Sequence, residues 1–558
     1  MHKIYFVFLL CCCQVLVAQQ GYRSPFDFKL LLAGNFGELR SNHYHSGLDL
    51  KTEGGVGKPV HAVEKGYVSR ISISAWGYGN GLYLTHPDGT TTVYGHLQRF
   101  APKIAEFARR QQYAKESFMI DVLVSPNQLP VEQGEVVAYS GNTGSSAGPH
   151  THFEVRNTKT EELYDPLIYL KNYFTDTRAP EIRNILICPV PGEGGVNDVE
   201  RKVRLNTTAL VGGKQRVIGK ITAWGKIGVA LRAEDYMNDT YNRYGVKEIT
   251  LFADGKQIFH SNLEHYLIPE THYVNSFTDY EYYKKTGFSF IRSFVEPGNK
   301  LRFIQTDRNR GYININEERT YNLAYRISDF FGNTTEMTFE IEGKRQNISK
   351  PNYSDTTLMH WNVNTDFKAR NSQLYIPVGY LYDDLHFIYK EKQDPSGIAS
   401  IFTMHNHFVP IHNDCRLSLR ISKDTVTNKN QYGIVYFQGN GVKWIGGTYK
   451  NGWITGNIRE LGDFTVRIDS KGPTIVPVNA NNWIKRRSIT FQLSDNMSGL
   501  ANFKGTLDGK FVLFEMNNRA VINWKFDLRD LPKGQHTLKL LAWDQCGNTS
   551  EYTRSLSW

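Results

Sequence analysis

Short alternating runs of apolar and polar residues dominate the chain from about residue 24 to residue 172. Examples are KPVHAVEKGYVSRISIS, GLYLTHPDGTTTVYGHL and EQGEVVAYSGNTG, which are separated by stretches rich in Gly, Asn and Asp. Alternation with a period of two predicts half-buried β-strands, and Asn-Gly and Asp-Gly pairs predict turns between them. This part of the chain is therefore expected to form a small, mainly β domain.

One segment of this region has a different period. Residues 101–118, APKIAEFARRQQYAKESF, place Ile104, Phe107 and Ala108 at the three- and four-residue spacing of one helix face. We predict an inserted helical segment here. It either packs against a neighbouring domain or forms a wall or lid of a substrate groove.

An internal repeat begins after residue 172. Three short motifs occur twice in the same order, and the first copy is longer because of an apparent insertion around 262–312. The pairs are DTRAPEI at 176–182 with DSKGPTI at 469–475, ADGKQIF at 253–259 with LDGKFVLF at 507–514, and ISDFFGNTTEM at 327–337 with AWDQCGNTSEY at 542–552. Each copy resembles bacterial immunoglobulin-like β-sandwich modules. The strand-like stretch between the copies predicts a third β module.

The N-terminus, MHKIYFVFLLCCCQVLVAQQ, combines a basic start, an apolar core and a small residue, Ala18. These features predict a signal peptide over residues 1–18, because the apolar core is too short for a comfortable membrane span. Lipidation of a cysteine in this segment is the alternative. Cleavage after Ala18 would leave Cys188, Cys415 and Cys546, an odd and scattered set that predicts buried free thiols rather than a disulfide framework.

Charge narrows the choice of partners. The chain of 558 residues has 65 Lys and Arg against 55 Asp and Glu, a formal net charge of +10. This balance favours an anionic environment such as cell-wall polymer or membrane headgroups. Because no dense block of Lys or Arg is present, nucleic acid is not an expected partner.

Two short motifs bring potential metal ligands together. In GPHTHFEV, residues 148–155, a strand would point His150 and His152 to the same face. In HYHSGLDL, residues 43–50, His45 and Asp49 would also share a face of an extended strand. Gly47 lies between them, and its missing side chain is expected to leave room for an ion.

A fifth candidate is His96 in VYGHL, at the end of a predicted strand. Imidazole nitrogens and a carboxylate oxygen suit Zn²⁺. Structural zinc usually has four protein ligands, whereas catalytic zinc keeps three and a water. Five candidates therefore leave two arrangements open: a closed site with a spare residue, or three ligands assisted by two histidines.

Four sequence blocks, taken together, resemble a known family. GNFGELRSNHYHSGLDL, GKPVHAVEKGYVSRI, VYGHL and SGNTGSSAGPHTHFEV are similar, in this order, to the lysostaphin/LytM-type zinc metallopeptidases, which are peptidoglycan endopeptidases. The resemblance covers roughly residues 25–170. It implies a small antiparallel β-sheet domain of the duplicated-hybrid-motif type, into which the helical segment is inserted.

The resemblance also assigns roles that spacing leaves open. It implies one Zn²⁺ per chain, held by His45, Asp49 and His152. It implies that His96 and His150 are the catalytic pair, which would assist a zinc-activated water.

Neighbouring polar residues have simpler interpretations. His43 is expected at the rim of the site, and His86, just before the turn PDG, is expected to be exposed to solvent. Glu154 shares a face with His150 and His152 on the predicted strand, so it either supports the site or forms a cross-strand salt bridge.

We therefore predict a mainly β protein, exported across the inner membrane to the periplasm or cell envelope, with no transmembrane span. Its expected activity is hydrolysis of peptide cross-links of peptidoglycan, with cross-links between D-amino acids as the first choice over a glycyl bridge. Its β modules are expected to contact envelope proteins. The alternatives are a non-enzymatic regulator of wall hydrolases and an envelope scaffold or adhesion protein. The predicted segments are a signal peptide at 1–18, a zinc metallopeptidase domain at 19–172, an Ig-like β module with an insertion at 173–345, a middle β module at 346–465 and a C-terminal Ig-like β-sandwich at 466–558.

Overall fold

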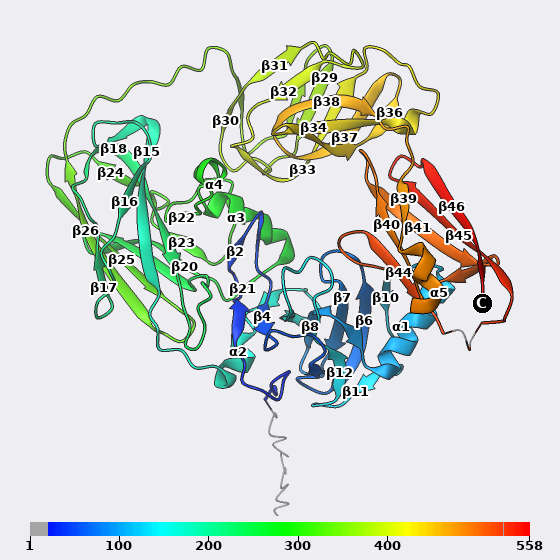
Figure 1. Ribbon diagram of the computed structural model, residues 1–558. Helices are drawn as coiled ribbons and strands as arrows, with labels where there is room; N and C mark the ends of the chain where they lie inside the picture. The colour runs from blue at the N-terminus through cyan, green and yellow to red at the C-terminus, as the bar shows by residue number, and fades with distance from the viewer. Residues whose placement is uncertain (1–20, 528, 530) are drawn as a thin grey trace, which may run out of the picture.

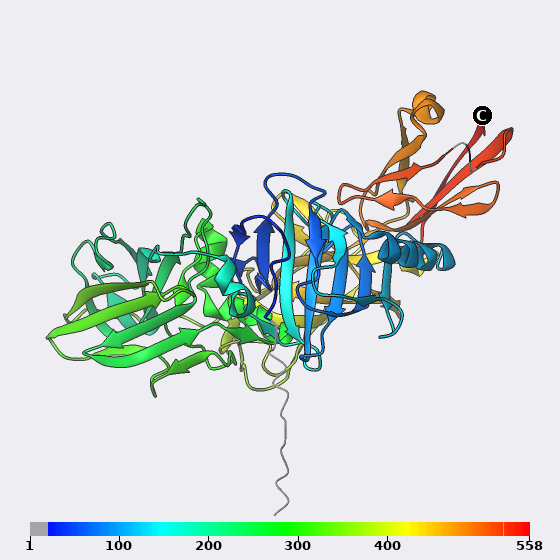
Figure 2. The ribbon, with the colours of Figure 1, turned by 90° about the horizontal axis from the view of Figure 1, so that it is seen from below.

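The fold is known from a computed structural model that describes residues 21–527, 529 and 531–558. The predicted signal peptide, residues 1–18, lies outside the described residues. The described chain consists mainly of β-strands, which confirms the predicted fold class. Figure 1 shows four groups of sheets that follow one another around a ring, and Figure 2 shows the same groups from below. Among the described residues, no helix is both long enough and apolar enough to cross a bilayer.

The first group of sheets, called here the N-terminal domain, is formed by the region in which the sequence predicts short alternating β-strands. Its main sheet runs β1-β4-β13-β8-β7-β6-β10, and β11 and β14 are added to β6 and β13. A three-stranded sheet, β5-β12-β9, and the hairpin β2-β3 lie beside it. The strands are β1 (Leu32–Gly34), β2 (Leu39–Arg40), β3 (His43–Tyr44), β4 (Leu48–Lys51), β5 (Pro59–His61), β6 (Gly66–Ile73), β7 (Asn80–Thr85), β8 (Thr90–Leu97), β9 (Arg99–Phe100), β10 (Ile120–Leu123), β11 (Pro130–Val131), β12 (Val136–Tyr139), β13 (His150–Asn157) and β14 (Leu163–Tyr164).

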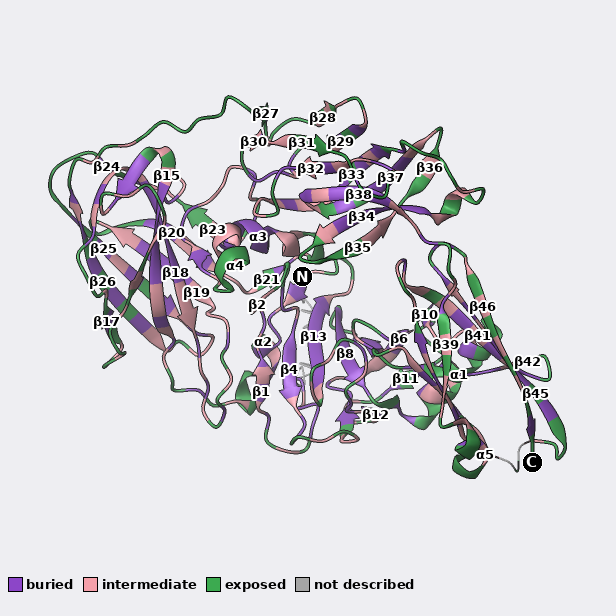
Figure 3. Cartoon of the chain, turned by 45° about the horizontal axis from the view of Figure 1, so that its top comes forward, coloured by how far each residue is buried: buried purple, intermediate pink, exposed green. Residues whose placement is uncertain are grey.

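Strand β13 lies at the centre of the main sheet, between β4 and β8. Its backbone pairs His152 with Asp49 of β4 on one side and with Gly95 of β8 on the other. The inner residues of β13 and all of β8 are buried, as Figure 3 shows for both strands. Because these strands are covered on both faces, the side chains at their ends are held in fixed positions.

The predicted helical insertion is confirmed as α1 (Pro102–Ala114), and α2 (Leu167–Leu170) closes the N-terminal domain. Pro102, at the first position of α1, suits a helix start, because the N–H group that proline lacks would have no partner within the helix. Ile104 and Ala108 are buried, as the helical spacing predicts. Tyr113 at the far end of α1 contacts the C-terminal sheets through Phe511, with ring centroids 5.5 Å apart.

The second group of sheets, called the second module, is fused to the N-terminal domain. Tyr266 in its insertion packs on Tyr44, with ring centroids 5.6 Å apart, and strand β21 pairs with β14 of the N-terminal domain. One hydrophobic core therefore continues across both. The elements are β15 (Glu181–Val196), β16 (Val203–Asn206), β17 (Lys214–Arg216), β18 (Thr222–Glu234), β19 (Glu248–Ala253), β20 (Lys256–Asn262), β21 (His265–Tyr266), α3 (Val274–Phe277), α4 (Tyr280–Thr286), β22 (Ile291–Arg292), β23 (Ile304–Thr306), β24 (Ile313–Ile315), β25 (Thr320–Ser328) and β26 (Thr334–Gly343).

The middle module contains two five-stranded sheets, β28-β29-β33-β37-β36 and β31-β32-β38-β34-β35, and the pair β27-β30. Its buried residues form a separate hydrophobic core. The strands are β27 (Thr357–Met359), β28 (Thr365–Lys368), β29 (Ser372–Ile376), β30 (Leu385–Phe387), β31 (Tyr389–Lys392), β32 (Ile401–Met404), β33 (Pro410–Arg420), β34 (Tyr432–Gln438), β35 (Gly441–Gly446), β36 (Thr448–Lys450), β37 (Trp453–Glu460) and β38 (Gly462–Ile468).

The C-terminal module contains two four-stranded sheets, β39-β40-β44-β43 and β42-β41-β45-β46. Its core includes the fully buried Trp483 and also Ala75 of the N-terminal domain, so the two units pack together. The elements are β39 (Thr474–Val478), α5 (Trp483–Arg486), β40 (Ser488–Ser494), β41 (Leu500–Leu507), β42 (Lys510–Val512), β43 (Glu515–Met516), β44 (Val521–Lys525), β45 (Gln535–Asp544) and β46 (Thr549–Ser557).

Contacts between the C-terminal module and the N-terminal domain close the ring seen in Figure 1. Lys504 forms an ion pair with Glu116, just after α1. The Asn518 side-chain amide donates to the carbonyl of Gly144 at 2.8 Å. The N-terminal domain and the C-terminal module therefore meet beside the loop that precedes β13.

Gly47 has a different role from the one that the sequence suggested. A Cβ atom at this position would lie 2.1 Å from the Phe153 carbonyl oxygen and 2.9 Å from Cγ of Glu154. The glycine therefore lets the segment before β4 approach the backbone of β13, and the expectation that it leaves room for an ion is wrong. The segment His45–Gly47 is also not a strand, since β3 ends at Tyr44 and β4 begins at Leu48.

The substitution Gly47→Ala is expected to destabilise the N-terminal domain, because the new methyl group would overlap backbone atoms that cannot rotate away. Overpacking of this kind costs about 1 to 3 kcal/mol in free energy of unfolding. Thermal unfolding measured by circular dichroism checks this, with Gly55→Ala as the control, since a Cβ at Gly55 meets nothing within 4 Å. Equal melting temperatures for the two variants would contradict the close approach.

Candidate metal centre

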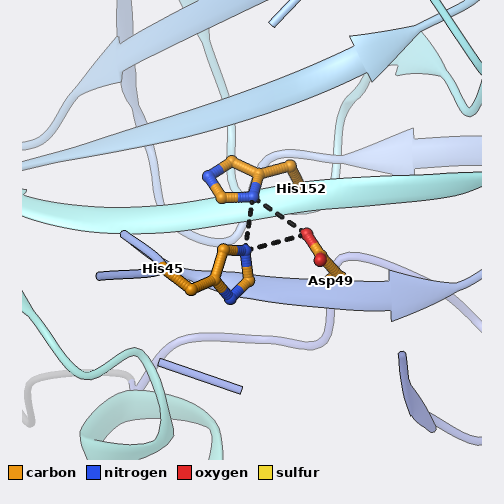
Figure 4. A group of neighbouring side chains, drawn as sticks. All are labelled: His45, Asp49 and His152. Carbon is orange, nitrogen blue, oxygen red and sulfur yellow. Dashed lines mark hydrogen bonds and ion pairs between the residues drawn. The ribbon is translucent and has the colours of Figure 1, made fainter. Parts of the chain in front are cut away.

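Three side chains from the ends of strands converge on one point. His45 Nε2 and His152 Nδ1 each lie 3.0 Å from Asp49 Oδ1, and the two nitrogens lie 3.1 Å from each other (Figure 4). His45 lies just before β4, Asp49 is in β4 and His152 is in β13, so the pairing of β4 with β13 assembles the group. These three residues could hold one metal ion.

In each histidine, the ring nitrogen that faces away from Asp49 makes a hydrogen bond that determines where the ring N–H lies. The Nδ1–H of His45 donates to the Asn35 carbonyl oxygen at 2.6 Å, and the Nε2–H of His152 donates to the Glu154 carboxylate at 2.9 Å. Since a carbonyl or an ionised carboxylate only accepts, these two nitrogens keep their protons, and the opposite nitrogens, which face Asp49, are the ones that would bind a metal ion after losing any proton they carry.

The electrostatic field at this point favours positive charge. Burial alone would lower the pKa of His152, but hydrogen bonds to Asp49 and Glu154 raise it to about 9. Burial alone would raise the pKa of Asp49, but the imidazole rings of His150, His152 and His45 around it hold that pKa well below its usual range. The group therefore combines an ionised carboxylate with histidines in a field that stabilises a cation.

Glu154 supports this arrangement by contacting the ring nitrogen of His152 that faces away from Asp49. Its carboxylate is fully buried, accepts from His152 and pairs with Arg156 at 2.6 Å. It also accepts hydrogen bonds from the hydroxyls of Tyr78 and Ser46. Of the two interpretations of Glu154, support of the site is the one seen, together with an ion pair along the same strand.

Several of the supporting residues carry no signal in the sequence. Arg40 donates to the second oxygen of Asp49 at 3.2 Å, and Asn35 orients His45. Tyr78 reaches Glu154 from the turn between β6 and β7, and Arg156 reaches it from the same strand, β13. Only Glu154 and Arg156 could be anticipated, because they share the two-residue period of His150 and His152.

His96 lies in a strained backbone conformation beside this group. Its φ is +59°, a value that residues other than glycine rarely adopt, and it occupies an irregularity in the pairing of β7 with β8. Its Nδ1–H donates to the Thr143 carbonyl oxygen at 2.9 Å. Burial lowers the pKa of His96 to about 4, so its imidazole is neutral at pH 7.

His150 completes the set of five sequence candidates. Its ring centroid lies 4.7 Å from that of His96, and its Nε2 lies 3.4 Å from Asp49 Oδ1. The Nδ1–H of His150 donates to the Gly148 carbonyl oxygen at 2.8 Å. All five candidate residues are therefore brought together, with His96 and His150 on one side of the possible metal ligands.

A groove lies next to the loop that holds His96, and neither His96 nor His150 lines it. It has a volume of about 710 Å³ and is bounded by α1, by the loop 142–144 and by the C-terminal module. Thr143, which holds His96 through its carbonyl oxygen, lines the groove, and so does Asn518 of the C-terminal module. The helical insertion is thus both a packing element and one wall of a groove next to the candidate centre.

Two other histidines near the N-terminal sheet differ in outcome. His43 is exposed, as expected for the rim of the site. The expectation that His86 is exposed is wrong: it is buried, and its nitrogens contact the Lys65 carbonyl oxygen at 2.9 Å and the Thr92 hydroxyl at 2.8 Å. The His86 side chain is therefore packed against the sheet, whereas the turn residues after it, Pro87 to Gly89, are exposed.

Comparison with known protein families gives two matches. Residues 43–115, which include His45, Asp49 and His96, match Peptidase family M23. This chain carries a domain of that family. The predicted resemblance to zinc metallopeptidases of the lysostaphin type is thereby confirmed. Residues 356–469, in the middle module, match the Zu5-like domain family.

Curated relatives align with the same part of this chain. They include the DD-carboxypeptidase/endopeptidase Mpg of Neisseria meningitidis, 29% identical over 133 residues and covering 24% of either chain. Lysostaphin of Staphylococcus simulans is 27% identical over 131 residues, 23% of this chain and 22% of its own. The peptidoglycan DD-endopeptidase ShyC of Vibrio cholerae is 29% identical over 153 residues, 25% of this chain and 29% of its own. This chain thus spans about a quarter of the length of the relatives it matches.

Solved structures also match only about a quarter of this chain. The catalytic domain of lysostaphin from Staphylococcus simulans is 24% identical and covers 25% of this chain and 89% of its own length, with a TM-score of 0.19. The catalytic domain of an M23 protein, EnpA, from Enterococcus faecalis is 22% identical, covers 24% of this chain and 87% of its own, and also has a TM-score of 0.19.

The substitution Glu154→Gln is expected to weaken zinc binding by about 10- to 100-fold, because it removes the charged acceptor that orients His152. Zinc affinity measured by competition with a chromogenic chelator checks this. Glu161→Gln is the matched control, since Glu161 contacts the same Arg156 at 3.0 Å but is largely exposed. If both variants bind zinc as tightly as the unmodified protein, the proposed support of His152 is wrong.

Proposed function

We propose that this protein is an exported zinc endopeptidase that hydrolyses peptide cross-links of bacterial peptidoglycan. The observation that carries the proposal is the convergence of His45 Nε2, Asp49 Oδ1 and His152 Nδ1, with both histidine tautomers fixed from behind. The M23 domain and relatives named as peptidoglycan endopeptidases support it.

Zinc fits this donor set. Two imidazole nitrogens and one carboxylate oxygen are a usual set for catalytic zinc, which keeps a further position open. Ligand atoms about 2 Å from a tetrahedral ion lie about 3.3 Å apart, close to the 3.0 to 3.1 Å between the three atoms here. Zinc, when bound, would supply Lewis-acid polarisation of the scissile carbonyl and would acidify a water molecule.

His96 and His150 are proposed to handle the protons of the reaction. Each donates its Nδ1–H to a backbone carbonyl, which leaves Nε2 with the lone pair. A neutral imidazole held in this way can accept a proton from the attacking water and return it to the leaving amine. When protonated, it can also donate a hydrogen bond to the oxygen on which negative charge develops. The low pKa of His96 keeps its imidazole in the neutral form that can accept the proton.

The substrate is proposed to lie in the groove beside Thr143. Its volume of about 710 Å³ suits a peptide of a few residues. The net charge of +10 suits an anionic polymer. We favour a cross-link between D-amino acids over a glycyl bridge, although relatives include both a DD-endopeptidase and a glycyl-glycine endopeptidase.

The remaining segments are proposed to serve export and placement. Residues 1–18 would direct the chain across the inner membrane to the periplasm or envelope, where peptidoglycan is found. Residues 173–345 and 466–558 would be Ig-like modules on either side of the middle module at 346–465. These modules would contact envelope proteins. All five site positions are filled, which favours an enzyme over a non-enzymatic regulator or scaffold.

Digestion of purified cross-linked muropeptides tests this function. The zinc-loaded protein is expected to convert cross-linked dimers to monomers with new termini that mass spectrometry identifies. Asp49→Ala is expected to lose both zinc and activity. His96→Ala is expected to keep zinc while kcat falls by about 10²- to 10⁴-fold. His43→Ala, at the exposed rim, is the control and is expected to leave both unchanged.

The outcomes of this digestion test the choice of substrate separately from the endopeptidase activity itself. If the dimers persist while a pentaglycine peptide is cut, the assignment to D-amino-acid cross-links is wrong. A folded, zinc-loaded protein that cuts neither substrate would contradict the endopeptidase proposal. Retention of full activity in His96→Ala would contradict the role of that histidine.

A further inference from the structure

Each copy of the internal repeat brings three aspartates together. In the second module they are Asp176, Asp235 and Asp329, called here the first trio. In the C-terminal module they are Asp469, Asp495 and Asp544, called the second trio. Within each trio, one carboxylate oxygen of every residue lies within 4.8 Å of the others. The first and last members belong to repeated motifs, and the middle members directly follow β18 and β40.

The two trios share one supporting arrangement. In the first, Asp329 accepts from the backbone N–H and the side-chain amide of Asn333, and that amide also reaches the Asp176 carbonyl oxygen at 3.3 Å. In the second, Asp544 and Asn548 repeat these contacts. The same scaffold therefore holds the last aspartate against the first in both copies, 200 or more residues apart in the chain.

The first trio contains carboxylate oxygens that nothing in the described chain satisfies. Asp235 is 4% exposed and Asp176 is 8% exposed, yet Asp235 Oδ1 and Asp176 Oδ2 have no hydrogen-bond partner among the described residues. Both side chains line an enclosed cavity of about 20 Å³. Such a cavity has room for one water-sized particle. A buried carboxylate without a partner is costly, so this position calls for a cation.

The charges around the trio agree with this requirement. Burial, with a smaller contribution from Asp329, raises the pKa of Asp235 to about 9. Lys247 also lines the cavity, but its ammonium group is paired with Glu264 at 2.7 Å. Arg178 lowers the pKa of Asp235, but burial and the carboxylates of Asp329 and Asp176 outweigh it, so Asp235 holds a proton at pH 7 unless a cation is bound.

We infer that the first trio binds one Ca²⁺ ion. All its donors are carboxylate oxygens, which hard cations prefer, whereas Zn²⁺ prefers sites that include imidazole or thiolate. Ca²⁺ also tolerates an irregular set of oxygen ligands, whereas Mg²⁺ demands a near-octahedral one. The site is separate from the candidate zinc centre and does not depend on the proposed function.

The ion would act at the junction between the second module and the N-terminal domain. Asn35 and Phe36 of the N-terminal domain line the same cavity as Asp176 and Asp235. The Asn35 side-chain amide donates to the Gly245 carbonyl oxygen at 2.8 Å. The backbone carbonyl oxygen of Asn35 accepts the hydrogen bond that orients His45. Calcium is therefore expected to stabilise the junction from which His45 is oriented.

Calcium binding to the full, zinc-loaded chain tests the inference. Isothermal titration with CaCl₂ is expected to show binding with a Kd of about 1 mM or tighter. Asp235→Asn is expected to reduce the number of ions bound by one, whatever the second trio contributes. Asp239→Asn is the matched control, because Asp239 lies four residues further on and is largely exposed. Binding that is absent, or that is the same in Asp235→Asn and in the control, would overturn the assignment.

Thermal unfolding gives a second and independent readout. Calcium is expected to raise the Tm of the unmodified chain, and this rise is expected to be smaller in Asp235→Asn. Without calcium, Asp235→Asn is expected to have about the same Tm as the unmodified chain at pH 7, because a carboxyl group with a pKa of about 9 is neutral there, like the amide that replaces it. A calcium-induced rise in Tm that is as large in Asp235→Asn as in the unmodified chain would contradict the site. Should Asp235→Asn not fold, Asp176→Asn replaces it in both measurements.

Discussion

The hydrogen-bonded position of β13 between β4 and β8 is the constraint on which the site depends. Pairing with β4 sets His152 opposite Asp49, and pairing with β8 sets His152 opposite Gly95, next to His96. A shift of either register by one residue would turn His150 and His152 to the other face of the sheet. Because β13 and β8 are buried, such a shift would also expose their apolar side chains, so packing of the core protects the geometry of the site.

The site is held by buried polar contacts that are satisfied almost completely. The Glu154 carboxylate is buried against Arg156, a pair that would be costly without further partners. Hydrogen bonds from His152, Tyr78 and Ser46 supply them. This layer fixes the His152 ring before any ion binds, which is the condition for a precise metal site. The first trio is the opposite case, because its carboxylates are buried without such partners.

The sequence predicted the residues of the site better than the reasons for their placement. Periodicity placed His150 and His152 on one face, but only family resemblance separated ligand from catalytic residue. Gly47 was misjudged because its neighbour Phe153 is distant in sequence, and His86 because one of its partners, Lys65, is also distant in sequence. The repeat motifs gave Asp176 and Asp329, but Asp235 joins them only through tertiary packing.

The closed ring gives the C-terminal module a direct part in the site. Asn518 contacts the loop that carries Thr143, and Thr143 orients His96. The C-terminal module and α1 also line one groove. The two interpretations of the helical insertion are therefore compatible: α1 packs against a distant module, and this packing shapes the groove beside Thr143. The width of that groove then depends on the interface between the N-terminal domain and the C-terminal module.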